Sequence, residues 1–513
     1  MSRIVRAVAL CLLLFSIAGC SGLPPLEGRI ASTADLDTGA TRLGLAIAPR
    51  LAAHPGKSGV YELTDARDAF AARILLADAA ERTLDVQYYI WRKDMTGTML
   101  FAALRRAAGR GVRVRLLLDD NNTSGLDSIL AALDAHPNIQ VRLFNPFAFR
   151  RVRALAYLTD FKRANRRMHN KSFTVDNQVT IVGGRNVGDE YFGAGDDMLF
   201  ADLDVMAVGP VVTDVSKDFD RYWNSRSSYP VKGVLEPVDA AELEALPAAA
   251  ARIETSPAAQ AYVQAVRGSS FTAQLVAGSL ALEWAPARMI SDDPAKGLGL
   301  AAPDTLVISK FKETVGRPVA ELDLVSPYFV PTDEGVKAFA GLAARGVKIR
   351  VLTNALEATD VAAVHAGYAP HRAALLAAGV SLYELRRTAP AALKKSAERL
   401  GGSSASSLHG KTFAVDRSRV FVGSFNFDPR SARLNTEMGF VIDSPGMAQR
   451  IAVAFGERIP AEAYEVRLSP DRKLYWIERD GGKLLRYDVE PGTSFLQRAA
   501  VLLMAMLPID WLL

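Results

Sequence analysis

One block of about twenty residues occurs twice in the chain, and this duplication limits the folds open to it. RRMHNKSFTVDNQVTIVGGRN spans residues 166–186, and SLHGKTFAVDRSRVFVGSFN spans residues 407–426. Both copies hold a histidine, a lysine, an aspartate, a pair of small residues and an asparagine at identical spacing. The histidines are 240 residues apart, which is far longer than the period of a solenoid repeat. We therefore expect two copies of one domain.

The secondary structure expected around the blocks repeats as well. Strands are predicted at 84–91 and 112–118 with an amphipathic helix between them, which is typical of a βαβ unit in a parallel or mixed sheet. The same order of strand, polar loop, alanine-rich helix and strand begins again at Glu321. The chain is thus predicted to be an α/β protein with two duplicated domains packed about a pseudo-twofold axis.

Changes in composition divide the chain further. A Pro/Ala/Glu-rich stretch separates the halves, and ERDGGK near the end is a hairpin-turn signal between apolar runs. The final stretch, 499–513, is apolar, and packing against the protein is favoured over contact with a bilayer. The predicted segments are a signal peptide at 1–19, a tether at 20–60, a first domain at 61–230, a connecting segment at 231–277, a second domain at 278–460, and a C-terminal hairpin with an apolar tail at 461–513.

The first 21 residues indicate export. Arg3 and Arg6 precede a short apolar run, which is typical of a signal peptide and too short to span a membrane permanently. The following IAGC resembles the lipobox of bacterial lipoproteins, with Cys20 as the lipidated residue; a plain signal peptide is the alternative. We expect the protein in the bacterial cell envelope, anchored by lipid to a membrane and facing the periplasm, with Ser21 favouring the outer membrane.

Composition excludes some classes of function. The chain has two cysteines, Cys11 and Cys20, so a mature chain beginning at Cys20 has neither a disulfide nor a thiolate metal site. The formal charge of +5 comes from 61 basic and 56 acidic residues, which is too mild a balance to indicate a nucleic-acid binder. It is compatible with a protein that works near an anionic surface.

The duplicated residues suit one phosphate. His169 and Lys171 fall two residues apart in a predicted strand and would share a face. If the halves pack about a twofold axis, this pair meets His409 and Lys411 in one cleft. Two imidazoles, two ammonium groups and the amides of both motif asparagines would surround a phosphate, with a nucleophile and an acid in line across phosphorus.

These residues resemble the HxKx4D motif and the following G-[GS]-x-N segment of the phospholipase D superfamily, over roughly residues 60–460. YYIWRKDMTG, GGRNVGDEYF and IERDGGKLLRYDVEPGTS are similar to stretches of bacterial cardiolipin synthases of the C type. The resemblance implies two α-β-α sandwich domains with the active site at their interface, and a reaction that needs no metal or other cofactor. One histidine forms a phosphohistidine, and the other protonates the leaving alcohol and activates the incoming one.

The resemblance also assigns roles to residues. Each motif aspartate is expected to be chiefly structural, as the anchor of a turn. Arg166 and Arg167 are expected in solvent or at a lipid headgroup, and Tyr88 and Tyr328 in the core, with ligand contact as the alternative. The predicted set is: catalytic, His169, Lys171, Asp176, His409, Lys411 and Asp416; histidine-orienting, Asp202 and Glu437; substrate-binding, Asn186, Asn426, Gly184 and Ser424; and weaker cleft candidates, Arg185, Glu190, Tyr191 and Arg430.

The expected function is a phosphatidyltransferase that makes cardiolipin from phosphatidylglycerol and a second phospholipid such as phosphatidylethanolamine. The alternative is a phospholipase D-type phosphodiesterase that hydrolyses phospholipids by the same chemistry. A nuclease is less favoured because such enzymes of the superfamily are usually one short repeat that dimerises, and no nucleic acid is expected as a partner. A catalytically inactive scaffold is disfavoured because both motifs are intact.

Overall fold

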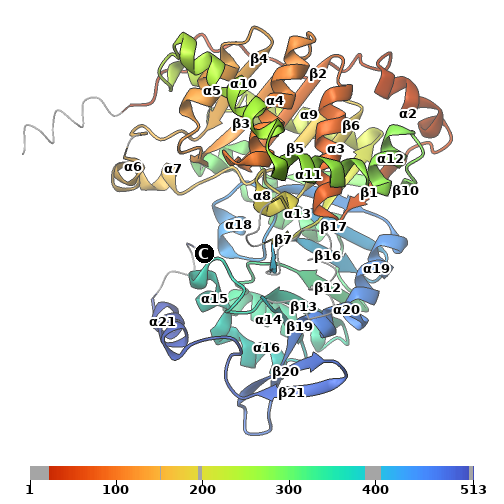
Figure 1. The fold of residues 1–513 in the computed structure, drawn as a ribbon. Coiled ribbons are helices and arrows are strands. Elements are labelled where there is room, and N and C mark those ends of the chain that lie inside the picture. The colour runs from red at the N-terminus through yellow and green to blue at the C-terminus, as the bar shows by residue number, and fades with distance from the viewer. Residues whose placement is uncertain (1–21, 151, 195–198, 388–405, 508–511, 513) are drawn as a thin grey trace, which may run out of the picture.

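The computed structural model describes residues 22–150, 152–194, 199–387, 406–507 and 512. These residues form two α/β domains, one above the other in Figure 1, each with a mixed sheet covered by helices. The predicted signal peptide and Cys20 lie outside the described residues. No described helix is long and apolar enough to cross a membrane.

The first domain contains a nine-stranded sheet in the order β10-β1-β8-β6-β5-β2-β3-β4-β9. Its central strands β2, β3 and β4 are parallel, as expected from the βαβ pattern, and the other neighbours pair antiparallel. The strands are β1 (Ser58–Leu63), β2 (Thr83–Ile90), β3 (Arg113–Asn122), β4 (Ile139–Phe144), β5 (Ser172–Val175), β6 (Val179–Gly183), β8 (Asp204–Val208), β9 (Ser228–Pro230) and β10 (Glu283–Ala285).

The second domain repeats this arrangement in a ten-stranded sheet, β11-β18-β17-β16-β12-β13-β14-β19-β20-β21. Here β12, β13 and β14 are the parallel strands. The strands are β11 (Ala287–Ser291), β12 (Glu321–Val325), β13 (Lys348–Asn354), β14 (Ser381–Leu385), β16 (Thr412–Val415), β17 (Arg419–Gly423), β18 (Met438–Ile442), β19 (Ala463–Leu468), β20 (Leu474–Asp480) and β21 (Lys483–Tyr487).

Helices cover both faces of each sheet, which confirms the predicted α-β-α sandwiches. In the first domain α9 packs on one face and α3 and α4 pack on the other. The helices are α2 (Arg42–Ala52), α3 (Ala66–Ala79), α4 (Met95–Gly109), α5 (Asp127–Asp134), α6 (Arg153–Thr159), α7 (Phe161–Ala164), α8 (Asp189–Phe192), α9 (Pro210–Trp223), α10 (Ala240–Glu254), α11 (Pro257–Arg267), α12 (Ser270–Val276), α13 (Val307–Thr314), α14 (Thr332–Ala343), α15 (Ala362–Tyr368), α16 (Arg372–Ala377), α18 (Pro429–Arg433), α19 (Pro445–Gly456), α20 (Arg458–Glu462) and α21 (Phe495–Ala505).

A buried ion pair marks the duplication inside each sheet. Asp85 on β2 lies beside Arg115 on β3, and two hydrogen bonds of 2.6 and 2.7 Å join them. Asp323 on β12 and Arg350 on β13 make the same pair at the same two distances. Such a two-point pair fixes the register of neighbouring strands as well as neutralising the buried charges. The two domains are therefore copies in their polar cores too.

The two sheets share one apolar cluster at the domain interface. Val182 and Val205 of the first domain pack with Val420, Val422 and Phe440 of the second, and all five are almost fully buried. Strands β6 and β8 approach β17 and β18 there. Because this cluster contains side chains of both domains, it is buried only when the domains pack together. Its burial therefore stabilises the interface.

The observed domain limits differ from the predicted ones at three places. The boundary between the sheets falls at Pro286 rather than 278, since β10 adds to the edge of the first sheet and β11 to that of the second. The predicted tether contains α2, and Arg29 within it donates hydrogen bonds to carbonyl groups of the first domain. The hairpin after residue 461 extends the second sheet as β19, β20 and β21.

Each motif aspartate anchors a turn at the end of the sheet away from the histidines. Asp176 has a left-handed φ of 48°, and its carboxylate accepts hydrogen bonds from the backbone N–H groups of Glu81, Arg82 and Thr83. Asp416, with φ 52°, binds the backbone at residues 319–321 in the same way. Aspartate and asparagine adopt this φ more readily than other non-glycine residues. Neither carboxylate is placed to touch a substrate. Both are turn anchors, as expected, and the catalytic role also predicted for them is wrong.

Replacing Asp176 with alanine should therefore weaken the fold. Three backbone N–H groups lose a charged acceptor, which costs about 2 kcal/mol, and the midpoint of thermal unfolding should fall. Asp35→Ala is the matched control, because that carboxylate forms an exposed ion pair with Arg82 that contributes little. Equal midpoints for the two variants in a thermal unfolding experiment would show that Asp176 does not hold the turn.

Candidate active site

A cavity of about 660 Å³ lies between the domains and contains both motif histidines. The end of β2 and the segments after β12, β6 and β17 reach it, so similar parts of the two copies face each other. The contributing residues include His169, Asn186 and Tyr89 from the first domain and His409, Asn426 and Tyr328 from the second. The predicted meeting of the two motifs in one cleft is what the structure shows.

His169 is held by the second domain through one ring nitrogen. Its Nδ1 lies 2.9 Å from Glu437 Oε2 and 3.1 Å from the backbone carbonyl oxygen of Ser424. A carbonyl oxygen can only accept a hydrogen bond, so Nδ1 must carry the proton. The lone pair of His169 is then on Nε2, the atom that a nucleophile at phosphorus needs.

His409 is held by the first domain in the mirrored way. Its Nδ1 lies 2.6 Å from Asp202 Oδ2, and Asp202 is buried. The ring of Tyr191 meets the His409 ring edge to face at 5.2 Å, as the ring of Tyr89 meets His169 at 4.9 Å. Each imidazole therefore has one nitrogen on a carboxylate of the opposite domain and one side against a tyrosine.

The backbone enforces this exchange of partners. Met168, just before His169, forms a parallel bridge with Thr436, just before Glu437. In the other half β15 (Ser406–Leu408) pairs in parallel with β7 (Leu199–Ala201), directly before His409 and Asp202. In both halves, the residue before the histidine is paired with the residue before the carboxylate. This pairing places each histidine beside the carboxylate that holds it. The sequence predicted the two carboxylates, and the structure adds that each serves the histidine of the other copy.

The motif lysines lie behind the histidines rather than on the cavity wall. Lys171 Nζ donates to the backbone carbonyl of His169 at 2.6 Å, and Lys411 Nζ donates to that of His409. Both lysines are buried. His169 and Lys171 precede β5 and do not lie in it, so their common orientation comes from this hydrogen bond and not from strand alternation.

The two motif asparagines differ in how much of their amide is engaged. Asn186 Oδ1 accepts from the backbone N–H of Ile90, and its Nδ2 donates to the hydroxyl of Tyr191. Asn426 Oδ1 is buried and has no hydrogen-bond partner among the residues that the structure describes. The amide of Asn426 can therefore turn toward a ligand, whereas that of Asn186 holds the cavity wall.

Gly184 and Ser424 support the carboxylates instead of binding substrate, which corrects the role predicted for them. A Cβ atom on Gly184 would lie 2.1 Å from Asp202 Oδ1, so only glycine leaves room for that carboxylate. Ser424, at the equivalent position, donates its hydroxyl proton to Glu437 Oε2. Sequence spacing aligned the two positions correctly but could not show what stands beside them.

Burial and charge make the two carboxylates unequal. Burial raises the pKa of Glu437 to about 7. Burial alone would also raise the pKa of Asp202, but the charge and hydrogen bond of His409 and the charge of Lys411 hold it below its usual value. Asp202 is therefore ionised at neutral pH, while Glu437 stands near the midpoint of its titration.

The motif histidines and lysines have lowered pKa values. Burial, followed by the positive charges of Lys171 and Lys411, holds the pKa of His169 well below its ordinary value. Burial likewise lowers the pKa of Lys171 to about 7 and lowers the pKa of His409, although Asp202 raises the latter. His169 is thus neutral at pH 7, which keeps its Nε2 lone pair available.

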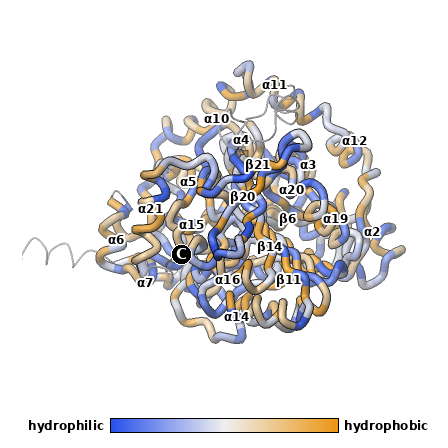
Figure 2. The backbone as a smooth tube through the Cα atoms, turned by 90° about the horizontal axis from the view of Figure 1, so that it is seen from below, coloured by the Kyte–Doolittle hydropathy of each residue, from blue (hydrophilic) through white to orange (hydrophobic). Residues whose placement is uncertain are grey.

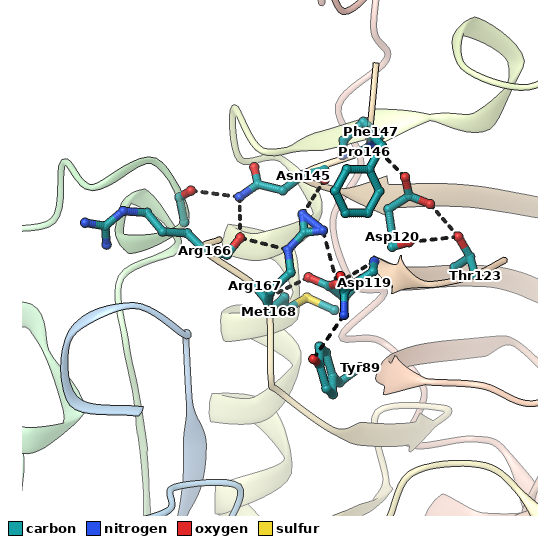
Figure 3. Close-up of polar contacts among 12 residues, drawn as sticks. Tyr89, Asp119, Asp120, Thr123, Asn145, Pro146, Phe147, Arg166, Arg167 and Met168 are labelled. Carbon is teal, nitrogen blue, oxygen red and sulfur yellow. Dashed lines mark hydrogen bonds and ion pairs between the residues drawn. The ribbon is translucent and has the colours of Figure 1, made fainter. Parts of the chain in front are cut away.

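Arg167 positions the loop that carries His169 (Figure 3). It is fully buried, with NH1 3.5 Å from Asp119 Oδ1, and the other oxygen of Asp119 accepts from the backbone N–H of Met168 at 2.7 Å. Asn145 binds the carbonyl of Arg166 from the other side. The expectation that Arg166 and Arg167 lie in solvent or at a headgroup is wrong for Arg167, whose charge is used inside the protein.

The weaker candidates divide. Glu190, Tyr191 and Arg430 line the cavity, whereas Arg185 is buried outside it. Tyr328 was expected in the core, but it lines the cavity, which is the alternative given for it. Tyr88 lies in the core, where its hydroxyl accepts a hydrogen bond from Arg73. The cavity is also lined by residues that the sequence did not single out, including Tyr89, Asn122, Asp360 and Asn435.

Strand alternation could have identified Tyr89. Neighbours on β2 point to opposite faces, so placing Tyr88 in the core sends Tyr89 to the other side.

Among the residues that the structure describes, no group of three or more His, Cys, Asp or Glu side chains is arranged to hold a metal ion.

Two histidines held across a twofold interface, each with a lysine behind it, define a site of the phospholipase D type. The family described as "Cardiolipin synthase, PLD-like domain" matches the chain twice, over residues 74–223 and 312–459. The chain belongs to this family, as its motifs predicted.

Similar proteins agree with this assignment. Cardiolipin synthase C of Escherichia coli K12 is 51% identical over 474 residues, which cover 92% of this chain and all of the relative. Cardiolipin synthase A of Edwardsiella ictaluri is 25% identical, covering 81% of this chain and 71% of the relative. The crystal structure of phosphatidylserine synthase from Haemophilus influenzae Rd KW20 has the same fold, with TM-score 0.57, 14% identity, and coverage of 92% of this chain and all of that one.

The raised pKa of Glu437 predicts a particular pH dependence. Ionised Glu437 accepts the Nδ1 proton of His169, so kcat/KM should fall as the pH drops through about 7. The Ser424 hydroxyl lowers the pKa of Glu437, so Ser424→Ala should raise that pKa and move the acid limb upward by about one pH unit. Ser418→Ala, in the turn beside Asp416, is the control, and a downward shift for Ser424→Ala would contradict the assignment.

Proposed function

We propose that the protein is a phosphatidyltransferase that makes cardiolipin from phosphatidylglycerol and a second phospholipid through a covalent phosphohistidine. The observation that carries this proposal is the pair of histidines in one cavity, each with its Nδ1 fixed by a carboxylate of the opposite domain. The 51% identity to a full-length relative named Cardiolipin synthase C supports the choice of substrate.

In the first step His169 is the nucleophile. Its neutral ring presents Nε2 to the phosphorus of a phosphatidyl group, a nitrogen–phosphorus bond forms, and the bond from phosphorus to the headgroup oxygen breaks. Glu437 stabilises the positive charge that develops on the ring. Lys171 and Lys411 lie behind the rings, and their protonated forms offset the charge of the phosphate oxygens.

His409 is the general acid of the first step and the general base of the second. Ionised Asp202 stabilises its protonated form, which gives the proton to the departing headgroup alcohol. In the second step neutral His409 takes the proton from the primary hydroxyl of phosphatidylglycerol, whose oxygen attacks phosphorus as the bond to His169 breaks. The protein is restored, and the products are cardiolipin and the free alcohol of the first lipid.

Transfer requires that water does not take the place of the second lipid. Tyr89, Tyr191 and Tyr328 line the cavity together with the apolar Val364, and the Tyr328 hydroxyl is bonded to Asp360 at 2.7 Å. Aromatic and apolar side chains of this kind favour an alcohol that brings its own apolar surface over a water molecule. This favours the transferase over the phosphodiesterase.

The products separate the two reactions. With vesicles of phosphatidylglycerol, alone or mixed with phosphatidylethanolamine, the purified protein should form cardiolipin, measured by mass spectrometry of the lipids. Phosphatidic acid without cardiolipin would overturn the transferase and support the phosphodiesterase. His169→Ala and His409→Ala should each lower turnover by at least about a thousandfold, because nucleophile and acid act as a unit.

Lipid anchoring through Cys20 is part of the proposal. The support is the sequence alone, a short apolar run followed by IAGC, and a diacylated cysteine holds a protein on a membrane stably. Such an anchor would keep the cavity close to lipid on the periplasmic side of the cell envelope, with the outer membrane favoured.

Replacing Cys20 should release the protein from the membrane. In cells fed a clickable fatty acid, the parent chain should be labelled and found in the membrane fraction, whereas Cys20→Ser should lose the label. Cys11→Ser is the matched control, since Cys11 lies within the predicted signal peptide and should not affect labelling. Labelling of Cys20→Ser equal to that of the parent would contradict the lipidation site.

A further inference from the structure

Exposed apolar side chains gather on two segments that are distant in sequence. Among the described residues 22 large apolar side chains are exposed, and ten of them lie within residues 152–161 and 495–507. The first segment contains α6 and the second contains α21. Contiguous exposed apolar surface on a folded protein marks a site of contact with another molecule or a membrane.

Helix α21 is apolar on two faces, and the protein covers one. Val501 is buried against Leu356 and Ala366, beside the cavity-lining helix α15. The opposite face presents a stripe at helical spacing that includes Leu496 (77% exposed), Leu503 and Met506. A helix that is apolar all round is normally buried in protein or in lipid.

Helix α6 has the same arrangement beside the other domain. Asp120 on β3 forms an ion pair with Arg150 at 2.6 Å and accepts from Arg153 through its backbone carbonyl. These contacts fasten the helix to the end of β3, where Asn122 lines the cavity. The outer side of α6 carries the exposed Leu155 and Leu158 (82% exposed). Val152 just before α6 and Phe161 at the start of α7 continue this row of exposed apolar residues at a spacing of three.

One arginine joins both segments to the rim of the cavity. Arg430 lines the cavity and donates to the carbonyl and side-chain oxygens of Asn165, directly after α7. The same guanidinium donates to the carbonyl of Leu512, which follows α21 and also lines the cavity. Both helices lie at the left of the molecule in Figures 1 and 2. Arg430 connects Asn165 and Leu512, which follow these helices in the chain, to the cavity.

The charge around the patches suits an anionic membrane. Lys162 is exposed next to Phe161, and Arg498 is the one charged residue of 495–507. The other basic residues near α6 include Arg150, Arg153 and Arg167, which form ion pairs with Asp120 and Asp119 inside the protein. Exposed Leu and Phe side chains interleaved with Arg and Lys are typical of helices that lie in the interface of anionic lipid bilayers. A membrane explains why the apolar surface lies beside the opening of a cavity that binds lipid. A soluble protein partner does not explain this position.

From these contacts we propose that α6 and α21 form the surface that rests on a bilayer of anionic phospholipid, with the cavity opening toward the lipid headgroups. The inference deepens the proposed function, because it assigns the path by which a membrane phospholipid reaches His169 and His409. The apolar side chains enter the interface on both sides of the opening, and a lipid need only rise a short distance to bring its phosphate into the cavity.

Fluorescence tests this placement without relying on turnover. Leu158→Cys and Leu503→Cys of the full chain, each labelled with an environment-sensitive dye, should brighten and shift to shorter wavelength with phosphatidylglycerol-containing vesicles. Leu45→Cys is the matched control: Leu45 is 63% exposed on α2, at the right of both views. An equal change at Leu45, or none at Leu158 and Leu503, overturns the proposal even if cardiolipin is made.

Kinetics provide the second readout. The double variant Leu158→Asp/Leu503→Asp should lose about tenfold or more in kcat/KM on vesicles, since two exposed leucines that would enter the bilayer become two charges. Its rate on monomeric short-chain phosphatidylglycerol should stay within about twofold of the parent, as should both rates of Leu45→Asp. A protein that is dimeric without lipid and becomes monomeric in the double variant would show that this face binds a second copy, and would overturn the bilayer.

Discussion

The site depends on one interaction made twice, a hydrogen bond from a histidine of one domain to a carboxylate of the other. Asp202 and Glu437 each lie in the copy opposite to the imidazole they hold. Neither domain alone can fix the tautomer of its histidine, and neither carboxylate has its partner unless the interface is closed. The shared apolar cluster around Val182 and Val422 supplies the packing that keeps the interface closed. The two histidines are therefore held in their reactive orientation only when the two domains are packed together.

Much of this could be predicted from the sequence, because duplication turns a weak signal into a strong one. A single histidine and lysine at this spacing is common, whereas two copies in register within repeated βαβ patterns indicate two similar domains and one shared site. The parallel strands β2–β4 and β12–β14 and the two histidines His169 and His409 follow from that argument. The carboxylates Asp202 and Glu437 were predicted from the family resemblance. Family resemblance then narrowed the chemistry to transfer at phosphorus.

What the sequence could not provide are contacts between segments hundreds of residues apart. Gly184 was assigned to substrate, yet its function is to leave space for Asp202, which only coordinates reveal. Arg167 resembles a surface charge until the buried Asp119 appears beside it. The limits of the domains also depend on pairing: β10 joins the first sheet and β11 the second, although only Pro286 separates them along the chain.

The two copies share one polypeptide, and this frees them from the symmetry that a dimer imposes. Two identical subunits about a twofold axis must present identical acids to both imidazoles. Here one half has a glycine beside an aspartate and the other a serine beside a glutamate, so the two carboxylates can differ in acidity. Fusion thus allowed a division of labour: one imidazole can specialise in bonding to phosphorus and the other in carrying protons, within a cavity whose backbone is still nearly symmetric.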